Sequence, residues 1–160
     1  MTTIAWKDGI MAADSQMTIN NYKTSTIKLY GLETVGVLGI AGAGSAMSRI
    51  MDWWLGGCEG DPPTLSPEDR EMGGACTGLL CTRKGVFYLE DGIYPHQITA
   101  AYASIGSGSD FAIAVMANGG SAVEAIDSAK LHDIYTGGET ISLICKDYFL
   151  KNKRVRGKKK

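Results

Sequence analysis

The chain opens with the stretch TTIAWKDGIMAAD, residues 2–14, which has the pattern of two short strands joined by a tight turn. Its two arms, Thr2–Trp6 and Ile10–Ala13, are apolar and rich in strand-forming residues. Lys7-Asp8-Gly9 between them supplies a hairpin turn, because glycine readily adopts the positive φ that such turns require. The sequence therefore predicts an antiparallel pair of strands that ends at Asp14.

Beyond this hairpin, apolar runs and helical stripes follow one another in separate groups. Further strands are predicted at Thr34–Ala41, Thr77–Thr82, Val86–Glu90, Ala103–Ile105 and Thr140–Cys145, and helices at Ser45–Leu55 (with Ser45 as the N-cap), Ser109–Asn118 and 121–131. The last of these begins with Ser121-Ala122-Val123-Glu124, which is a capping-box pattern. Residues 58–75 are expected to be a loop with at most one or two helical turns after Pro67.

This order of elements favours one fold class. Strands linked by hairpins, with the helices grouped between them, are typical of an antiparallel α+β layered fold and not of a doubly wound one. The 160 residues and the hydrophobic content of 44% suit a single domain, which we expect to cover residues 1–150.

The charges are unevenly distributed along the chain. Seven of the last ten residues are Lys or Arg, so the net charge of −1 for the whole chain leaves −8 for residues 1–150. An acidic body argues against a domain-wide nucleic-acid surface. We expect residues 151–160 to be a basic, flexible tail; a tether to an acidic partner is the alternative.

The four cysteines and two histidines do not have the spacing of a metal site. No C-x-x-C pair occurs, and His96 and His132 are far apart in the sequence, so neither a metal nor another cofactor is expected. Free thiols, the absence of a signal peptide and the shortness of the run Val35–Met47 favour a cytoplasmic protein without a membrane span.

The second residue offers nucleophilic chemistry. Removal of the initiator Met1 would leave Thr2 with a hydroxyl nucleophile beside its own amine, whose ordinary pKa is about 7.7–8.0 and therefore suits a general base. Threonine with its free α-amine is a known pairing of nucleophile and base. A Met-Thr start is common, however, so the motif alone carries little weight.

Several further segments give that start a context. They are Thr2-Thr3-Ile4, Ile10–Thr18, Ile27-Lys28-Leu29, Gly39–Gly44, Ile105–Gly108 and His132–Gly138. In order and spacing they resemble the proteasome β-subunit family, and most closely its bacterial HslV type, over Thr2 to about Leu150. The resemblance implies an N-terminal nucleophile (Ntn) hydrolase, a sandwich of two antiparallel sheets between helix layers that assembles into rings.

The resemblance also implies roles for individual residues. Thr2 matches the nucleophile, Lys28 the lysine beside it, and Asp14 the acid that would pair with Lys28 and keep it charged. Gly42 matches the glycine whose N–H forms the oxyanion hole, a donor worth about 10²–10³ in rate; helix–strand packing is the other reading of its glycine-rich turn. The remaining matches are Ser107, Asp133 and Thr136, as a supporting hydrogen-bond group, with Thr18 and Ile40 as substrate-binding residues.

The function implied is a threonine endopeptidase that works inside a ring built from copies of itself. No ATP-binding motif G-x-x-x-x-G-K-[ST] is present, so any ATP-driven unfoldase would be a separate chain. Two alternatives stay open: a catalytically silent ring or scaffold protein with the same fold, and an amidohydrolase of small molecules. The family's second helix is mostly missing from residues 56–75, which leaves ring size and stacking undetermined.

Overall fold

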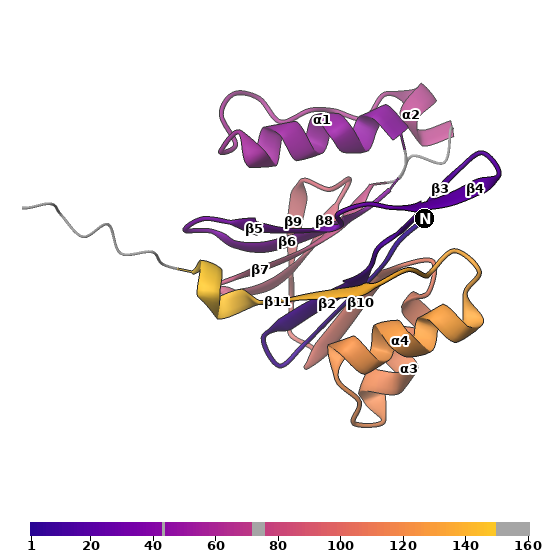
Figure 1. Cartoon of the computed structure of the whole chain (residues 1–160). Coiled ribbons are helices and arrows are strands. Elements are labelled where there is room, and N and C mark those ends of the chain that lie inside the picture. Colours follow the sequence, from indigo (N-terminus) through magenta and orange to yellow (C-terminus); the bar gives the residue numbers. More distant parts are fainter. Residues whose placement is uncertain (43, 72–75, 150–160) are drawn as a thin grey trace, which may run out of the picture.

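The computed structural model describes residues 1–42, 44–71 and 76–149. These residues form four layers, in which two antiparallel sheets lie between two pairs of helices (Figure 1). The expected α+β sandwich of two antiparallel sheets between helix layers is therefore confirmed. The basic tail expected at 151–160 lies outside the described residues.

The first sheet contains the hairpin that opens the chain. Its strand order is β10-β1-β2-β11, all antiparallel. The strands are β1 (Thr3–Lys7), β2 (Ile10–Asp14), β10 (Tyr102–Gly106) and β11 (Thr140–Ile144). Asp8 and Gly9 have φ of 51° and 76°, so the turn between β1 and β2 is of the kind that the sequence predicts.

The second sheet is a meander with the order β5-β6-β7-β8-β9. Its strands are β5 (Leu29–Leu32), β6 (Gly36–Ala41), β7 (Thr77–Thr82), β8 (Gly85–Glu90) and β9 (Tyr94–Ile98). β5 and β9 are edge strands that the sequence analysis did not predict. Their residues lack a distinct apolar alternation, and β9 is almost wholly exposed, so hydrogen bonds to the neighbouring strand define it.

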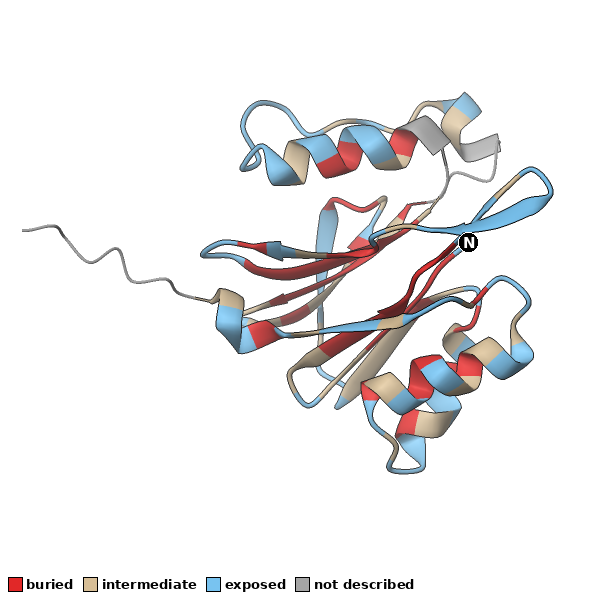
Figure 2. Ribbon diagram, viewed as in Figure 1, coloured by how far each residue is buried: buried red, intermediate tan, exposed pale blue. Residues whose placement is uncertain are grey.

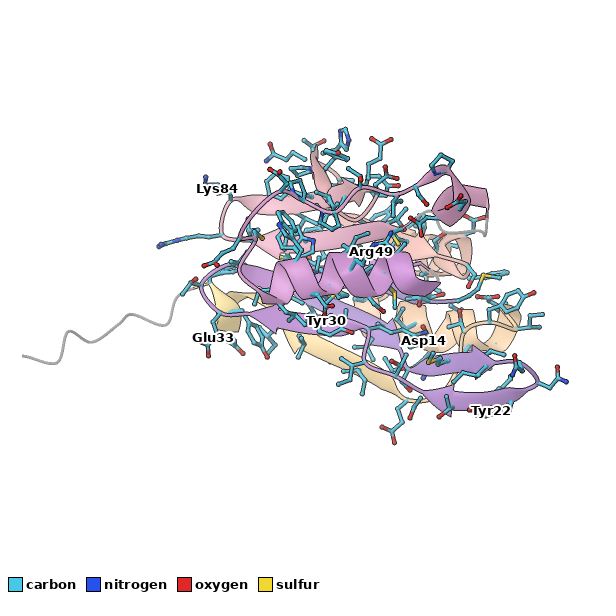
Figure 3. The ribbon with its side chains drawn as sticks, turned by 90° about the horizontal axis from the view of Figure 1, so that it is seen from above. Asp14, Tyr22, Tyr30, Glu33, Arg49 and Lys84 are labelled. Atoms are coloured by element: carbon cyan, nitrogen blue, oxygen red, sulfur yellow. The ribbon has the colours of Figure 1, made fainter. Side chains whose placement is uncertain are left out.

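A separate hairpin, β3 (Gln16–Ile19) and β4 (Tyr22–Ser25), extends away from the body of the molecule. Figure 3 shows Tyr22 near its tip, beyond the end of α1. It too was not predicted, because a short, largely exposed hairpin buries little apolar surface and leaves no periodic pattern in the sequence.

The helices cover the two outer faces. They are α1 (Gly44–Leu55), α2 (Pro67–Glu71), α3 (Ser109–Ala117) and α4 (Ala122–His132). The capping box of α4 is confirmed: the Ser121 side chain accepts the Glu124 N–H, and Glu124 accepts the Ser121 N–H. The predicted N-cap of the first helix is wrong, since α1 begins at Gly44 and Ser45 lies inside it.

Three apolar clusters hold the layers together (Figure 2). One lies between α1 and the second sheet, one between the two sheets, and one between the first sheet and the pair α3 and α4. Strand alternation divides side chains between them: in β6, Val37 packs between the sheets while Leu38 and Ile40 pack toward α1. Each sheet thus packs against another layer on both of its faces, although the edge strands β9 and β11 stay largely exposed.

The last strand is followed by a short 3₁₀ helix, η1 (Cys145–Tyr148). It occupies the position where the sequence predicts the final residue of the strand, and Cys145 is fully buried between the sheets. No helix among the described residues is both long and apolar enough to cross a bilayer.

Candidate active site

Thr2 lies directly before β1, where the end of β10 fixes its backbone. The Thr2 carbonyl accepts a hydrogen bond from the Ser107 N–H at 3.0 Å. Gly106 has a φ of +96°, and a Cβ at that position would stand 1.7 Å from the same carbonyl oxygen. Only glycine therefore allows β10 to hold the start of β1 this closely.

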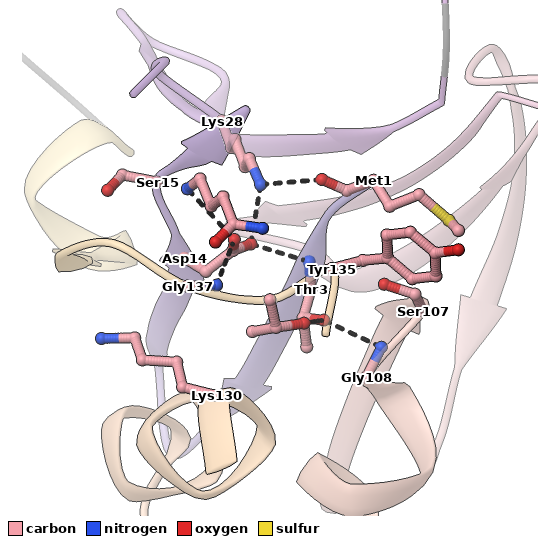
Figure 4. A network of polar contacts seen from close by, with 12 residues as sticks. Met1, Thr3, Asp14, Ser15, Lys28, Ser107, Gly108, Lys130, Tyr135 and Gly137 are labelled. Carbon is pink, nitrogen blue, oxygen red and sulfur yellow. Dashed lines mark hydrogen bonds and ion pairs between the residues drawn. The ribbon is translucent and has the colours of Figure 1, made fainter. Parts of the chain in front are cut away.

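A buried ion pair lies beside this start. Lys28, just before β5, and Asp14, the last residue of β2, are joined by a contact of 2.8 Å between Nζ and Oδ1. Their side chains are only 4% and 0% exposed. Lys28 Nζ also donates to the Met1 carbonyl at 3.0 Å, so the ammonium lies against the peptide bond between Met1 and Thr2 (Figure 4).

The Asp14 carboxylate has four donors. Oδ1 accepts from Lys28 and from the Thr3 N–H at 2.9 Å, and Oδ2 accepts from the N–H groups of Gln16 at 3.2 Å and Gly137 at 3.1 Å. A buried carboxylate is costly unless it is paired and hydrogen-bonded. These donors come from four separate parts of the chain, so the carboxylate also links the start of β1 to the loop before β11.

Burial lowers the pKa of Lys28, because desolvation disfavours its charged form. The hydrogen bond to Asp14 and the charges of Asp14 and Asp133 act in the opposite direction and do not fully compensate. The result is an ammonium that loses its proton more readily than an ordinary lysine.

A second carboxylate, Asp133, lies across from this pair, just after α4. Its Oδ2 accepts from the hydroxyls of Ser107 at 2.6 Å and Thr136 at 2.5 Å, and Oδ1 accepts the Tyr135 N–H at 3.1 Å. Desolvation raises the pKa of Asp133, but these hydrogen bonds and the positive chain terminus outweigh it and leave the pKa below its usual value. The three hydrogen bonds are larger causes of this lowering than the terminal charge, which is that of the Met1 amine.

Thr3 joins the two carboxylates, and the sequence analysis gave it no role. Its N–H donates to Asp14, while its Oγ1 lies 2.6 Å from the Thr136 hydroxyl and accepts the Gly108 N–H at 2.9 Å. Thr3 is 0% exposed. Its position next to the candidate nucleophile is the one signal in the sequence that could have indicated it, since the two partners of its hydroxyl lie more than a hundred residues away.

Gln16 is a second residue that sequence reasoning missed. Its N–H reaches the Gly137 carbonyl at 2.9 Å, and its side-chain amide donates to the Ile134 carbonyl at 3.3 Å. A Cβ on Gly137 would stand 2.3 Å from the Gln16 Oε1. Gln16 thus clamps the loop that carries Asp133 and Thr136 onto the end of β2.

The structure brings together six of the residues singled out from the sequence: Thr2, Asp14, Lys28, Ser107, Asp133 and Thr136. It does not join the other three to them by contacts. Gly42 follows β6 and packs on Cys76, whose Sγ would lie 2.7 Å from an added Cβ, and the described residues include no hydrogen bond between Gly42 and Thr2. Thr18 is exposed on β3, and Ile40 is buried beneath α1.

An open cleft of about 870 Å³ lies on the Lys28 side of this group. Its wall is formed by the β3–β4 hairpin, the segment from Thr26 to Lys28, and the loop before β11. Thr2 is not part of the wall. Within the described residues, no group of three or more His, Cys, Asp or Glu side chains is arranged to hold a metal ion.

Known proteins resemble this chain in structure and not in sequence. No family model and no curated protein matches its sequence. The solved structure of BPH from Thiobacillus denitrificans matches with a TM-score of 0.63 at 16% identity, over 89% of this chain and 95% of that one. A second structure of that protein, in complex with epoxomicin, has the same TM-score and identity and covers 89% and 96% of the two chains.

The eukaryotic HslV of Trypanosoma brucei matches with a TM-score of 0.60 at 17% identity, over 89% of this chain and 97% of that one. Nearly the whole length of each neighbour is covered, so this chain has the fold of HslV-type, proteasome-like proteins. At such identities the likeness establishes the fold, and the chemistry has to be argued from the residues.

Proposed function

We propose that this chain is a threonine-type endopeptidase, an N-terminal nucleophile hydrolase in which Thr2 becomes the first residue when Met1 is removed. The observation that carries the proposal is the Lys28 ammonium, which is paired with Asp14 and lies 3.0 Å from the Met1 carbonyl. Met1 is 59% exposed, so an aminopeptidase can reach it. Its removal takes away the carbonyl that Lys28 holds and leaves the Thr2 amine in the same place.

The reaction follows from these groups. The Thr2 amine takes the proton of the Thr2 hydroxyl as the oxygen attacks the peptide carbonyl, and the Lys28 charge stabilises the developing alkoxide. The Gly42 N–H stabilises the oxyanion. The proton passes to the leaving amine, the bond to it breaks, and an ester on Thr2 remains. Water then attacks this ester, which releases the new carboxyl end and restores the threonine.

The surrounding residues act on this exchange of protons. Asp14 keeps Lys28 charged in spite of its burial, because an opposite charge within contact distance favours the ammonium. Asp133, with Ser107 and Thr136, orients the Thr2 amine once Met1 is removed; the hydrogen bonds that join these three side chains beside the Thr2 carbonyl support this role.

The substrate is proposed to be an extended peptide. The main chain at Thr18 lies on an exposed strand, which suits pairing with an added strand. Ile40, which the resemblance assigns to the pocket for the side chain before the cut, is buried beneath α1, so the proposal gives its side chain no contact with the peptide. A structural neighbour is complexed with epoxomicin. We extend this to the present chain and expect epoxomicin to inhibit it.

The assembly proposed is a cytoplasmic ring of copies of this chain, fed by a separate ATP-dependent unfoldase when the substrate is folded. HslV-like structural neighbours support self-association in general. Residues 1–150 are treated as one catalytic domain, and the basic residues 151–160 as an accessory tail.

The test compares Thr2→Ala with Thr2→Ser. Mass spectrometry first establishes whether Met1 is removed, native mass spectrometry gives the number of subunits, and a panel of fluorogenic peptides gives the rates. We expect Thr2→Ala to abolish cleavage with assembly unchanged and Thr2→Ser, which retains a hydroxyl, to keep part of the rate. Retention of Met1, or full activity in Thr2→Ala, contradicts the proposal.

Small-molecule amides in the same panel separate the two remaining possibilities. Hydrolysis of these amides without cleavage of peptides, lost in Thr2→Ala, identifies an amidohydrolase. A ring of processed chains without any Thr2-dependent turnover identifies a scaffold protein.

A further inference from the structure

The hydroxyl of Thr3 lies in a chain of hydrogen bonds that can run in only one direction. Its far end is the Asp133 carboxylate, which accepts the Thr136 hydroxyl at 2.5 Å. A hydroxyl has one proton, so Thr136 cannot also donate to Thr3 across their 2.6 Å contact. Thr3 is therefore the donor to Thr136, and its oxygen in turn accepts the Gly108 N–H at 2.9 Å.

The other end of this series of hydrogen bonds, at Gly108, is also fixed. The Gly108 amide begins α3, and a Cβ on Gly108 would lie 2.6 Å from the Thr3 hydroxyl oxygen and 2.9 Å from that of Thr136. Only a glycine gives both hydroxyls room to reach this amide. Gly108, Thr3 and Thr136, which form this series of hydrogen bonds, are all buried. Water therefore does not replace a missing partner without a rearrangement.

The backbone of Thr3 is held from the opposite side. Its N–H donates to Asp14 Oδ1, the oxygen that also accepts Lys28. Figure 4 shows Thr3 between Asp14 on one side and Gly108 on the other. The residue directly after the proposed nucleophile is thus tied to both carboxylates of the site, to Asp14 by its main chain and to Asp133 through its hydroxyl and Thr136.

We propose that Thr3 is a positioning residue for the Thr2 nucleophile, through the one-way chain Gly108 N–H, Thr3 O–H, Thr136 O–H, Asp133 carboxylate. This inference rests on the proposed function. These hydrogen bonds fix how far β1 extends between Lys28 and Asp133, and hence where the Thr2 amine and hydroxyl lie. Because Thr3 contacts neither the substrate nor the transferred proton, its loss changes the rate of the chemical step and not the binding of the peptide.

The experiment compares Thr3→Val, which removes the hydroxyl at nearly constant shape, with Thr3→Ser, which keeps it. A misplacement of the reacting groups by about 1 Å costs about 10²-fold in rate. We therefore expect Thr3→Val to lower kcat by about 10²-fold with KM nearly unchanged. Thr3→Ser is expected to restore kcat to near the wild-type value, which a role in apolar packing would not do.

Ser104→Ala is the matched control. The Ser104 hydroxyl donates to the Ile4 carbonyl at 2.7 Å, in the same pair of strands, β10 and β1, but away from both carboxylates. This variant loses one part-buried hydrogen bond and should keep the wild-type kcat. An equal fall of kcat in both variants indicates general loosening of the strand pair and overturns the proposal.

The kinetics and folding of the Thr3 variants also separate the positioning role from the proposed function. An unchanged kcat in Thr3→Val, or a raised KM alone, overturns the positioning role while leaving the Thr2 peptidase intact. Thr3→Ala, which leaves room for a water, replaces Thr3→Val if the latter does not fold; if neither folds, Thr3 is a structural residue and the proposal is wrong. A wild-type chain without Thr2-dependent cleavage instead overturns the proposed function itself.

Discussion

Two ion pairs in this molecule have almost the same length and very different surroundings. Lys28 and Asp14 are 2.8 Å apart, and Arg49 and Asp69 are 2.7 Å apart. The first pair is buried, with side chains 4% and 0% exposed. In the second, Arg49 on α1 is 48% exposed and reaches toward the short helix α2 (Figure 3).

The partners of each pair explain the difference. Asp14 accepts three backbone N–H groups besides Lys28, and Lys28 faces the peptide bond before Thr2. Asp69 accepts the backbone N–H of Ser66, three residues before it, and the guanidinium of Arg49 on the neighbouring helix α1. Contact distance is therefore a poor guide to function. Burial, combined with hydrogen-bond donors from distant segments, distinguishes the candidate site from an exposed ion pair that joins two helices.

Removal of the buried carboxylate should have the largest effect. Asp14→Ala leaves the Lys28 ammonium buried without a partner and leaves the Thr3, Gln16 and Gly137 N–H groups unsatisfied. We expect a loss of about 3–5 kcal/mol in the free energy of unfolding, the usual cost of breaking a buried pair. Urea denaturation of this variant beside the wild type measures it. A loss below about 1 kcal/mol, the range of exposed pairs, would contradict the contrast drawn here.

Neutralising the other partner should act mainly on catalysis. Lys28→Met keeps the length and the apolar stem of the side chain but removes the charge beside Thr2. Loss of a group that stabilises developing negative charge costs about 10²–10³-fold in rate, so we expect a fall of that order in kcat/KM for a peptide substrate. Near-normal cleavage by a folded Lys28→Met ring would show that the ammonium is not needed.

The pH dependence of cleavage tests the environment of Lys28. The proposed mechanism uses the charged form of Lys28, whose pKa is lowered by burial from an ordinary value of about 10.4. Deprotonation occurs as the pH rises, so kcat/KM should begin to fall at a lower pH than an ordinary lysine allows. At the acid side it should fall as the Thr2 amine becomes protonated. An alkaline limb that begins at the ordinary lysine value would contradict this assignment.

The outer pair should contribute least. Arg49→Met removes the exposed guanidinium, and exposed pairs contribute little because water and salt already screen them. We expect kcat, the pH profile and the unfolding midpoint to remain close to the wild-type values. A destabilisation as large as that of Asp14→Ala would mean that burial is not what separates the two pairs.

The sequence by itself determined the features that depend on neighbours in the chain. The turn at Asp8-Gly9, the capping box of Ser121 and Glu124, and the α+β order of elements all follow from local signals. The resemblance of its short motifs also led to the residues that meet around Thr2. Each of these signals spans a few residues, so local propensity and periodicity are enough to reveal it.

Tertiary structure alone decided how those residues are joined. Thr3 and Gln16 lie in segments that carry the resemblance but received no role from it. In the structure Thr3 contacts Thr136 across 133 positions of the chain, and Gln16 contacts Ile134 across 118. The exposed strands of the β3–β4 hairpin and of β9 are likewise defined by hydrogen bonds to a neighbouring strand and not by a pattern of apolar residues in their sequences. Hydrogen bonds between distant segments form only once the apolar layers have packed, and that packing determines which polar groups are enclosed together and must satisfy one another.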